Sequence, residues 1–74
     1  MTLPKHHHPH DSKWIIEKLA KLPPAYRERA IKAYSNLYLE VHNATDKPHK
    51  KHCEARREAN TRLREYVERV LASQ

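Results

Sequence analysis

Residues 19–26 read LAKLPPAY, and the proline pair Pro23–Pro24 within this stretch divides the chain into helices. A residue that precedes a proline is pushed out of the α region, so a helix that begins near Ser12 has to end before Pro23. Pro24 suits the first turn of a following helix, because that position needs no N–H donor. The stretch therefore predicts two helices joined by a short, fixed connection.

Upstream of the prolines, we expect a short helix over residues 13–21, with Asp11 or Ser12 as its N-cap. Its apolar side chains fall at i, i+4 and i+7 on one face and are Ile15, Leu19 and Leu22. Trp14 lies off this face, and we expect it to cover the rim of the core with Lys18 stacked on its ring.

Downstream of the prolines, residues 24–42 predict a long second helix with two apolar faces. The main face comprises Tyr26, Ala30, Ala33, Tyr34, Leu37 and Val41, and a weaker set comprises Ile31, Tyr38 and Leu39. A helix with two apolar sides is typical of the middle element of a bundle. Because the chain has no glycine, we expect Asn43 to take the left-handed position that ends this helix.

A third helix is predicted from the first turn at Pro48 to about Leu71, with Thr45 or Asp46 as its cap. Its core face comprises Ala55, Ala59, Leu63, Tyr66 and Val70, with Val67 on the flank. We therefore predict an all-α fold, in which the short first helix packs on a long antiparallel hairpin formed by the second and third helices.

Residues 1–11 have no apolar periodicity and contain two prolines and four histidines. This composition predicts a flexible, disordered His-rich tail ahead of a single helical domain over residues 12–74. The run His6-His7-His8-Pro9-His10 would bind Ni²⁺ or Zn²⁺ loosely, as imidazoles on a mobile tail do.

The composition of the 74 residues excludes several classes of protein. Without glycine the chain has no P-loop, dinucleotide-binding fingerprint or nucleophile elbow. No apolar run approaches the roughly 20 residues of a transmembrane helix, and the N-terminus lacks the apolar stretch of a secretory signal. The single cysteine, Cys53, cannot form an internal disulfide. We therefore expect a cytoplasmic protein that has no membrane partner.

The net charge of +6 is concentrated in residues 47–64, where seven basic side chains stand against two acidic ones. Lys50, Arg57 and Arg64 recur every seven residues and form one line opposite the core face of the third helix. The candidate nucleic-acid contact comprises Lys47, Lys50, Lys51, Arg57, Asn60 and Arg64. Lysine and arginine with interleaved asparagine suit contacts to phosphates and base edges.

Acidic side chains on the same helix favour a plainer interpretation, a solvated helix face. The expected pairs are Glu54 with Arg57, Glu58 with Arg62, and Glu65 with Arg69. Pairs at i+3 and i+4 stabilise exposed helices and would weaken the positive field.

Four residues form a candidate metal site, although their spacing matches no known zinc motif: His42, His49, His52 and Cys53. His52 lies on the core side, so a packed or capping histidine is the favoured interpretation, and we expect no cofactor. Cys53 lies in a positive field with histidines nearby, which are the surroundings of a reactive thiol. A thin helical hairpin supplies neither a pocket nor oxyanion donors, so we expect no enzymatic activity.

Two stretches carry a resemblance to a known group of proteins. The first is Leu22-Pro23-Pro24 with Tyr34-Ser35 after it, and the second is ARREANTRLR at residues 55–64 with Tyr66-Val67 after it. Together they resemble small uncharacterised helical proteins encoded in enterobacterial phages and prophages, over roughly residues 14–70. The resemblance implies a bacterial cytoplasm and an accessory protein that acts by binding, and it implies no activity.

We therefore expect a non-enzymatic, phage-type accessory protein that acts as a small protein-interaction module on a host or phage protein. Its expected anchors are Trp14, Tyr38 and Leu39, because aromatic residues dominate interface energies. The alternative is a nucleic-acid-binding accessory protein that uses the basic face of the third helix. Exposed apolar residues and the length of that helix also leave room for a homodimer.

Overall fold

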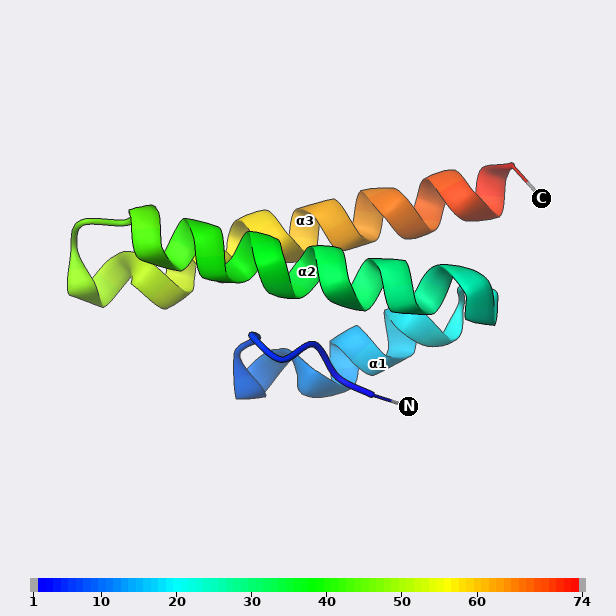
Figure 1. Ribbon diagram of the computed structural model, residues 1–74, viewed down its shortest axis with the longest axis horizontal. Coiled ribbons are helices and arrows are strands. Elements are labelled where there is room, and N and C mark those ends of the chain that lie inside the picture. Colours follow the sequence, from blue (N-terminus) through cyan, green and yellow to red (C-terminus); the bar gives the residue numbers. More distant parts are fainter. Residues whose placement is uncertain (1, 74) are drawn as a thin grey trace.

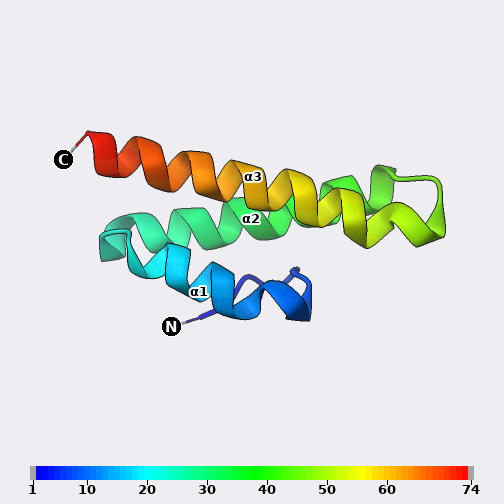
Figure 2. The same ribbon diagram turned by 180° about the vertical axis from the view of Figure 1, so that it is seen from behind.

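The structure is a computed structural model, and it describes residues 2–73. Three α-helices, α1 (Ser12–Ala20), α2 (Pro24–Ala44) and α3 (Lys51–Ala72), are accompanied by two 3-10 helices, η1 (Pro9–Asp11) and η2 (Pro48–Lys50). α2 and α3 lie side by side and antiparallel, and α1 packs on the part of this hairpin that is farther from the 45–50 connection (Figures 1 and 2). The predicted all-α arrangement of a short helix on a helical hairpin is confirmed.

The connection between α1 and α2 forms where the proline pair predicts it. Pro23 is extended, with φ −57° and ψ 149°, and Pro24 opens α2. Arg27 of α2 reaches back, and its Nε and Nη2 donate to the carbonyls of Leu19 at 3.1 Å and Ala20 at 3.4 Å. An α2 side chain thus satisfies carbonyls that the end of α1 leaves without a helical partner.

The core lies where α1 meets the hairpin. Its buried apolar members are Ile15, Leu19, Leu22, Ala30, Tyr34, Tyr38, Ala55, Ala59, Leu63, Val67 and Val70. Ala55 and Ala59 of α3 are completely buried, and small side chains let helices approach closely. Val67 takes the core position predicted for Tyr66, which is only half-buried.

The buried face of α2 differs from the predicted one. Ala30, Tyr34 and Tyr38 follow one another at i, i+4 and i+8 and are buried, whereas Tyr26 and Ala33 are exposed. The reason is that α1 and α3 both contact α2, so its buried side is the one that lies between them. Ala30 and Tyr34 belong to the main predicted face, whereas Tyr38 belongs to the weaker predicted set.

Both ends of the 45–50 connection differ from the prediction. Asn43 lies inside α2, and no residue between 2 and 73 has a positive φ. The helix ends instead at Thr45, whose N–H and Oγ1 both donate to the carbonyl of Val41, at 3.1 and 2.8 Å. Neither Thr45 nor Asp46 caps the third helix, because η2 begins at Pro48 and leads directly into α3.

The N-terminal segment, which we define as residues 2–11, packs on the helices. Pro4 is buried, Leu3 contacts the core, and the backbone N–H of His6 donates to Ser35 Oγ at 3.1 Å. Asp11 at the end of the segment is also buried. This arrangement differs from the flexible tail expected from the sequence, because contacts spread along the segment hold it against α2 and α3. Met1 lies outside the described residues.

Candidate protein-interaction surface

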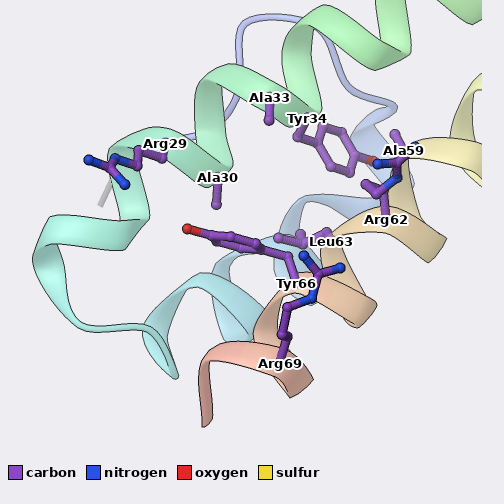
Figure 3. A pocket seen from close by; sticks show the side chains of 9 residues that line it. All are labelled: Arg29, Ala30, Ala33, Tyr34, Ala59, Arg62, Leu63, Tyr66 and Arg69. Carbon is purple, nitrogen blue, oxygen red and sulfur yellow. The ribbon is translucent and has the colours of Figure 1, made fainter. Parts of the chain in front are cut away.

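A groove of about 320 Å³ lies between α2 and α3 (Figure 3). All of its lining side chains come from these two helices: Arg29, Ala30, Ala33, Tyr34, Ala59, Arg62, Leu63, Tyr66 and Arg69. We call it the α2/α3 groove. Since α1 contributes no lining residue, the groove is a second place at which a molecule can pack on the hairpin.

The floor of the α2/α3 groove is apolar and shallow. Ala30 and Ala33 form its α2 side, and Leu63 and Tyr66 form its α3 side. The ring of Tyr66 extends from α3 across the groove toward Ala30 (Figure 3). Ala33 is exposed and Tyr66 is half-buried, so both offer apolar surface that a bound partner would remove from water.

The inner wall of the groove is fixed by Tyr34. Its side chain is buried, and its hydroxyl donates a hydrogen bond to Oδ1 of Asn60 on α3. The ordinary tyrosine pKa of 10.0 already keeps the hydroxyl protonated at neutral pH, and burial raises the pKa of Tyr34 further. This bond links α2 to α3 directly behind the groove.

Three exposed arginines, Arg29, Arg62 and Arg69, border the groove. None of the three forms an ion pair, since the one ion pair among residues 2–73 joins Arg56 to Asp11. The predicted pairs of Glu54 with Arg57, Glu58 with Arg62 and Glu65 with Arg69 do not form. Exposed pairs on a helix contribute only about 0.3–0.5 kcal/mol, which is too little to hold two long side chains in one geometry. The border of the groove therefore keeps its positive charge.

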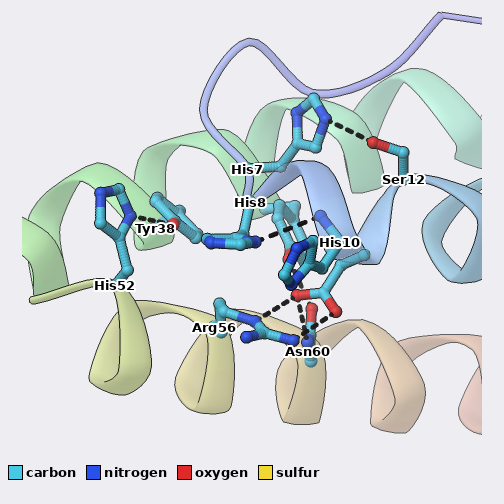
Figure 4. A network of polar contacts seen from close by, with 10 residues as sticks. His7, His8, His10, Ser12, Tyr38, His52, Arg56 and Asn60 are labelled. Atoms are coloured by element: carbon cyan, nitrogen blue, oxygen red, sulfur yellow. Dashed lines mark hydrogen bonds and ion pairs between the residues drawn. The ribbon is translucent and has the colours of Figure 1, made fainter. Parts of the chain in front are cut away.

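A polar network joins the N-terminal segment to α3 on another side of the hairpin (Figure 4). Arg56 Nε donates to Asp11 Oδ2 at 2.8 Å, and Arg56 Nη2 donates to Asp11 Oδ1 at 3.0 Å. Asn60 Nδ2 donates to the same Oδ2 at 3.1 Å. His7 connects the segment to α1, with Nδ1 at 2.7 Å from the Pro4 carbonyl and Nε2 at 3.1 Å from Ser12 Oγ at the start of α1.

The network sets the ionisation of Asp11 and engages the side-chain amide of Asn60. The hydrogen bonds from Arg56 hold the pKa of Asp11 below its ordinary value of 3.8, and Asp11 in turn raises the pKa of Arg56. Asp11 does stand at the N-cap of α1, but its carboxylate makes no capping hydrogen bond because Arg56 and Asn60 use it. Asn60 bonds to both Tyr34 and Asp11, so it is not the free base-reading side chain that the sequence suggested.

The remaining residues of the predicted nucleic-acid contact lie mostly in solvent. Lys50, Arg57 and Arg64 are exposed, as their seven-residue spacing predicts, and Lys47 is exposed as well. Lys51 is half-buried, and its Nζ donates to the carbonyl of His42 at 3.1 Å, across the connection between α2 and α3. The exposed line on α3 is therefore present, but without Asn60.

The three predicted protein anchors differ in how far their side chains are exposed to solvent. Tyr38 is 4% exposed and belongs to the core. Its hydroxyl lies 2.6 Å from His52 Nδ1, so the prediction that it anchors a partner is wrong. Trp14 is half-buried against the core with Lys18 Nζ 5.6 Å from its ring, as predicted. Leu39 is 39% exposed, and single exposed leucines are common on protein surfaces.

The histidines gather differently from the predicted metal site. The His42 and His52 rings lie 4.8 Å apart, but the N-terminal segment adds His8, 5.6 Å from His52, and His10, 4.7 Å from His8. His49 and Cys53 are exposed. Across residues 2–73, no group of three or more His, Cys, Asp or Glu side chains is arranged to hold a metal ion.

The pKa of His8 is lowered from its ordinary value. Desolvation is the larger cause, and the positive charge of Arg56 is the second.

The sequence alone does not identify Arg29, Arg62, Tyr66 and Arg69 as a site. A signal was present, because Arg62, Tyr66 and Arg69 recur at i, i+4 and i+7 and so share one side of α3. This spacing indicates a groove only when the register between α2 and α3 is known, because that register places Arg29 of α2 across from the three α3 side chains.

Comparison with protein-family models, curated proteins and solved structures gives no match for this chain. Over residues 2–73, no helix combines the length and apolar character that crossing a membrane requires.

Proposed function

We propose that this chain is a non-enzymatic protein-interaction module, an accessory protein of the phage type, that docks a partner protein in the α2/α3 groove. One observation carries the proposal: an accessible apolar floor is bordered by three arginines that have no carboxylate partner. Exposed apolar surface with a polar border is typical of interaction sites, and arginine and tyrosine are enriched at their centres.

A protein partner suits this surface better than a nucleic acid does. The accessible floor offers Ala33 and the Tyr66 ring, which gain from contact with apolar side chains. The amide that could read bases, Asn60, is committed to Asp11 and Tyr34.

Site-specific photocrosslinking in the native cells tests the proposal. A benzophenone amino acid replaces Ala33 in the groove or, as the matched control, the exposed Ala20 at the end of α1. We expect a discrete protein adduct from position 33 that position 20 does not give, and that mass spectrometry identifies. Equal labelling at both positions, or an adduct that nuclease removes, would contradict the proposal.

Nucleic-acid binding remains the second candidate, because four exposed basic residues, Lys47, Lys50, Arg57 and Arg64, form no ion pair within the described chain. Its test is a titration with labelled duplex and single-stranded oligonucleotides at about 50 and 200 mM salt. Binding that falls steeply with salt, and that is lost in Arg57→Ala/Arg64→Ala, would favour this function. No binding at the lower salt concentration would eliminate it.

A further inference from the structure

We infer that the occupant of the α2/α3 groove is an amphipathic α-helix that carries a narrow apolar stripe flanked by acidic side chains. This inference rests on the proposed function and specifies the partner of the same site.

The shape of the groove favours a helix. It lies between two antiparallel helices, and α1 already shows how a helix packs on this hairpin: Ile15, Leu19 and Leu22, at i, i+4 and i+7, are at most 1% exposed. Along the α2/α3 groove, Ala30 and Ala59 are almost completely buried, so the accessible apolar surface is Ala33 on α2 and the Tyr66 ring on α3. The distance between packed helices depends on the side chains at the contact, so the small Ala33 side chain lets a helix approach α2 closely. A helix seated there would add a fourth element to the bundle.

The charge of the groove specifies the flanks of that helix. Arg29 borders the groove from α2, and Arg62 and Arg69 border it from α3, so both sides are positive. Arg62 and Arg69 are seven residues apart, which places them about 10 Å apart along one side of α3. Carboxylates at i and i+7 on a partner helix have the same spacing, and guanidinium groups bind carboxylates with two parallel hydrogen bonds.

A second copy of this chain is a poorer occupant. A symmetric dimer across this face would place the same patch on both sides of the interface, so the arginines would face their own counterparts. Single-stranded nucleic acid could stack on Tyr66, but the groove supplies this one half-buried ring and no free amide. The charge and shape of the groove therefore favour a different protein that presents an acidic helix.

A display selection tests the inference without knowledge of the natural partner. The library consists of 18-residue helical peptides that keep apolar residues at i, i+4 and i+7 and vary the flanking positions among Glu, Lys and Gln. The targets are the wild-type protein, the groove variant Arg29→Glu/Arg62→Glu/Arg69→Glu, and the control variant Arg57→Glu/Arg64→Glu. All substituted residues are exposed, and circular dichroism verifies that each variant folds.

We expect the wild-type and control proteins to enrich glutamate at the flanks, and the groove variant to enrich lysine. Each arginine should contribute about two- to fivefold to the affinity for the selected peptide, as measured by fluorescence anisotropy. The triple variant should therefore lose at least about tenfold. The milder variant Arg29→Gln/Arg62→Gln/Arg69→Gln should lose the preference between glutamate and lysine without reversing it.

Three results would overturn the inference: no enrichment, the same enrichment on the groove variant, or binding of a labelled oligonucleotide that only the groove variant loses. These results are distinct from failure of the proposed function. If crosslinking at position 33 captures a protein but the selection shows no acidic preference, the groove is an interaction site whose partner is not an acidic helix. If neither experiment gives a signal, the proposed function fails as well.

Discussion

The ion pair between Asp11 and Arg56 gives the most direct test of whether the N-terminal segment is docked. The change is Asp11→Asn, which keeps a residue that is favoured at an N-cap and removes only the charge and one acceptor. Three hydrogen bonds, of 2.8, 3.0 and 3.1 Å, reach the Asp11 carboxylate from Arg56 and Asn60. Since the substitution leaves the shape nearly unchanged, the loss of stability should report the electrostatic part of the network.

The expected loss of stability follows from how deeply the Asp11 and Arg56 side chains are buried. Buried hydrogen bonds to a charged group contribute about 1.5–3 kcal/mol. The Asp11 side chain is 12% exposed but that of Arg56 is 37% exposed, so solvent screens the pair and reduces its contribution. We expect Asp11→Asn to lower the free energy of unfolding by about 1–1.5 kcal/mol. For a domain of this size, that corresponds to a drop in Tm of about 5–10 °C.

Urea unfolding followed by circular dichroism measures the change, and Asp46→Asn is the control, since Asp46 is exposed and forms no ion pair. The control should stay within about 0.5 kcal/mol of the wild type. In a double-mutant cycle with Arg56→Gln, the coupling energy should be about 1 kcal/mol. A coupling energy below about 0.3 kcal/mol would refute the reasoning and mean that residues 2–11 are not held against α3 in solution.

Three further predictions concern pH and the core. Because the folded-state pKa of Asp11 lies below its ordinary value of 3.8, its stabilising effect should be complete well above pH 3.8 and be lost as the pH falls below 3.8 and through the folded-state pKa. Urea unfolding should therefore show the wild type and Asp11→Asn converging in acid, and a constant difference would contradict this. Tyr38→Phe removes the hydroxyl that bonds His52 Nδ1 and should cost about 0.5–1.5 kcal/mol in chemical denaturation, whereas an unchanged midpoint would mean that the bond contributes nothing. Leu63→Ala opens a cavity where α2 and α3 meet and should cost about 2–5 kcal/mol; a loss below about 1 kcal/mol in a thermal melt would show that the core collapses around the site.

The parts of the fold that depend on local chemistry could be predicted from the sequence. Pro23 and Pro24 act through their own backbone geometry, so the end of α1 and the start of α2 are found where the residues place them. The i, i+4, i+7 spacing of Ile15, Leu19 and Leu22 likewise identifies a buried face without knowledge of any partner.

The parts that depend on how elements meet could not be predicted. Tyr38 and Leu39 are neighbours in an apolar set, and only the joint position of α1 and α3 makes the first buried and the second exposed. The docking of the N-terminal segment could not be predicted either. Single contacts from Leu3, Pro4 and Asp11 hold the segment, and such contacts leave no apolar periodicity in its sequence. The α2/α3 groove could not be predicted, because its lining depends on the register between two helices and no single helix encodes that register.

The order of α1 before α3 in the chain has a consequence for how the protein folds during synthesis. α1 and Asp11 leave the ribosome before α3, which supplies Ala55, Ala59 and Leu63 to the shared core. The partners of Asp11 on α3, Arg56 and Asn60, lie 45 and 49 residues further along. Ile15 and Leu19 therefore remain incompletely covered until α3 has emerged. The α2/α3 hairpin, whose contacts are more local, should close before α1 docks, because shorter loops cost less entropy to close. A ribosome that stalls before α3 is complete would hold an α1 whose apolar face only α2 could cover.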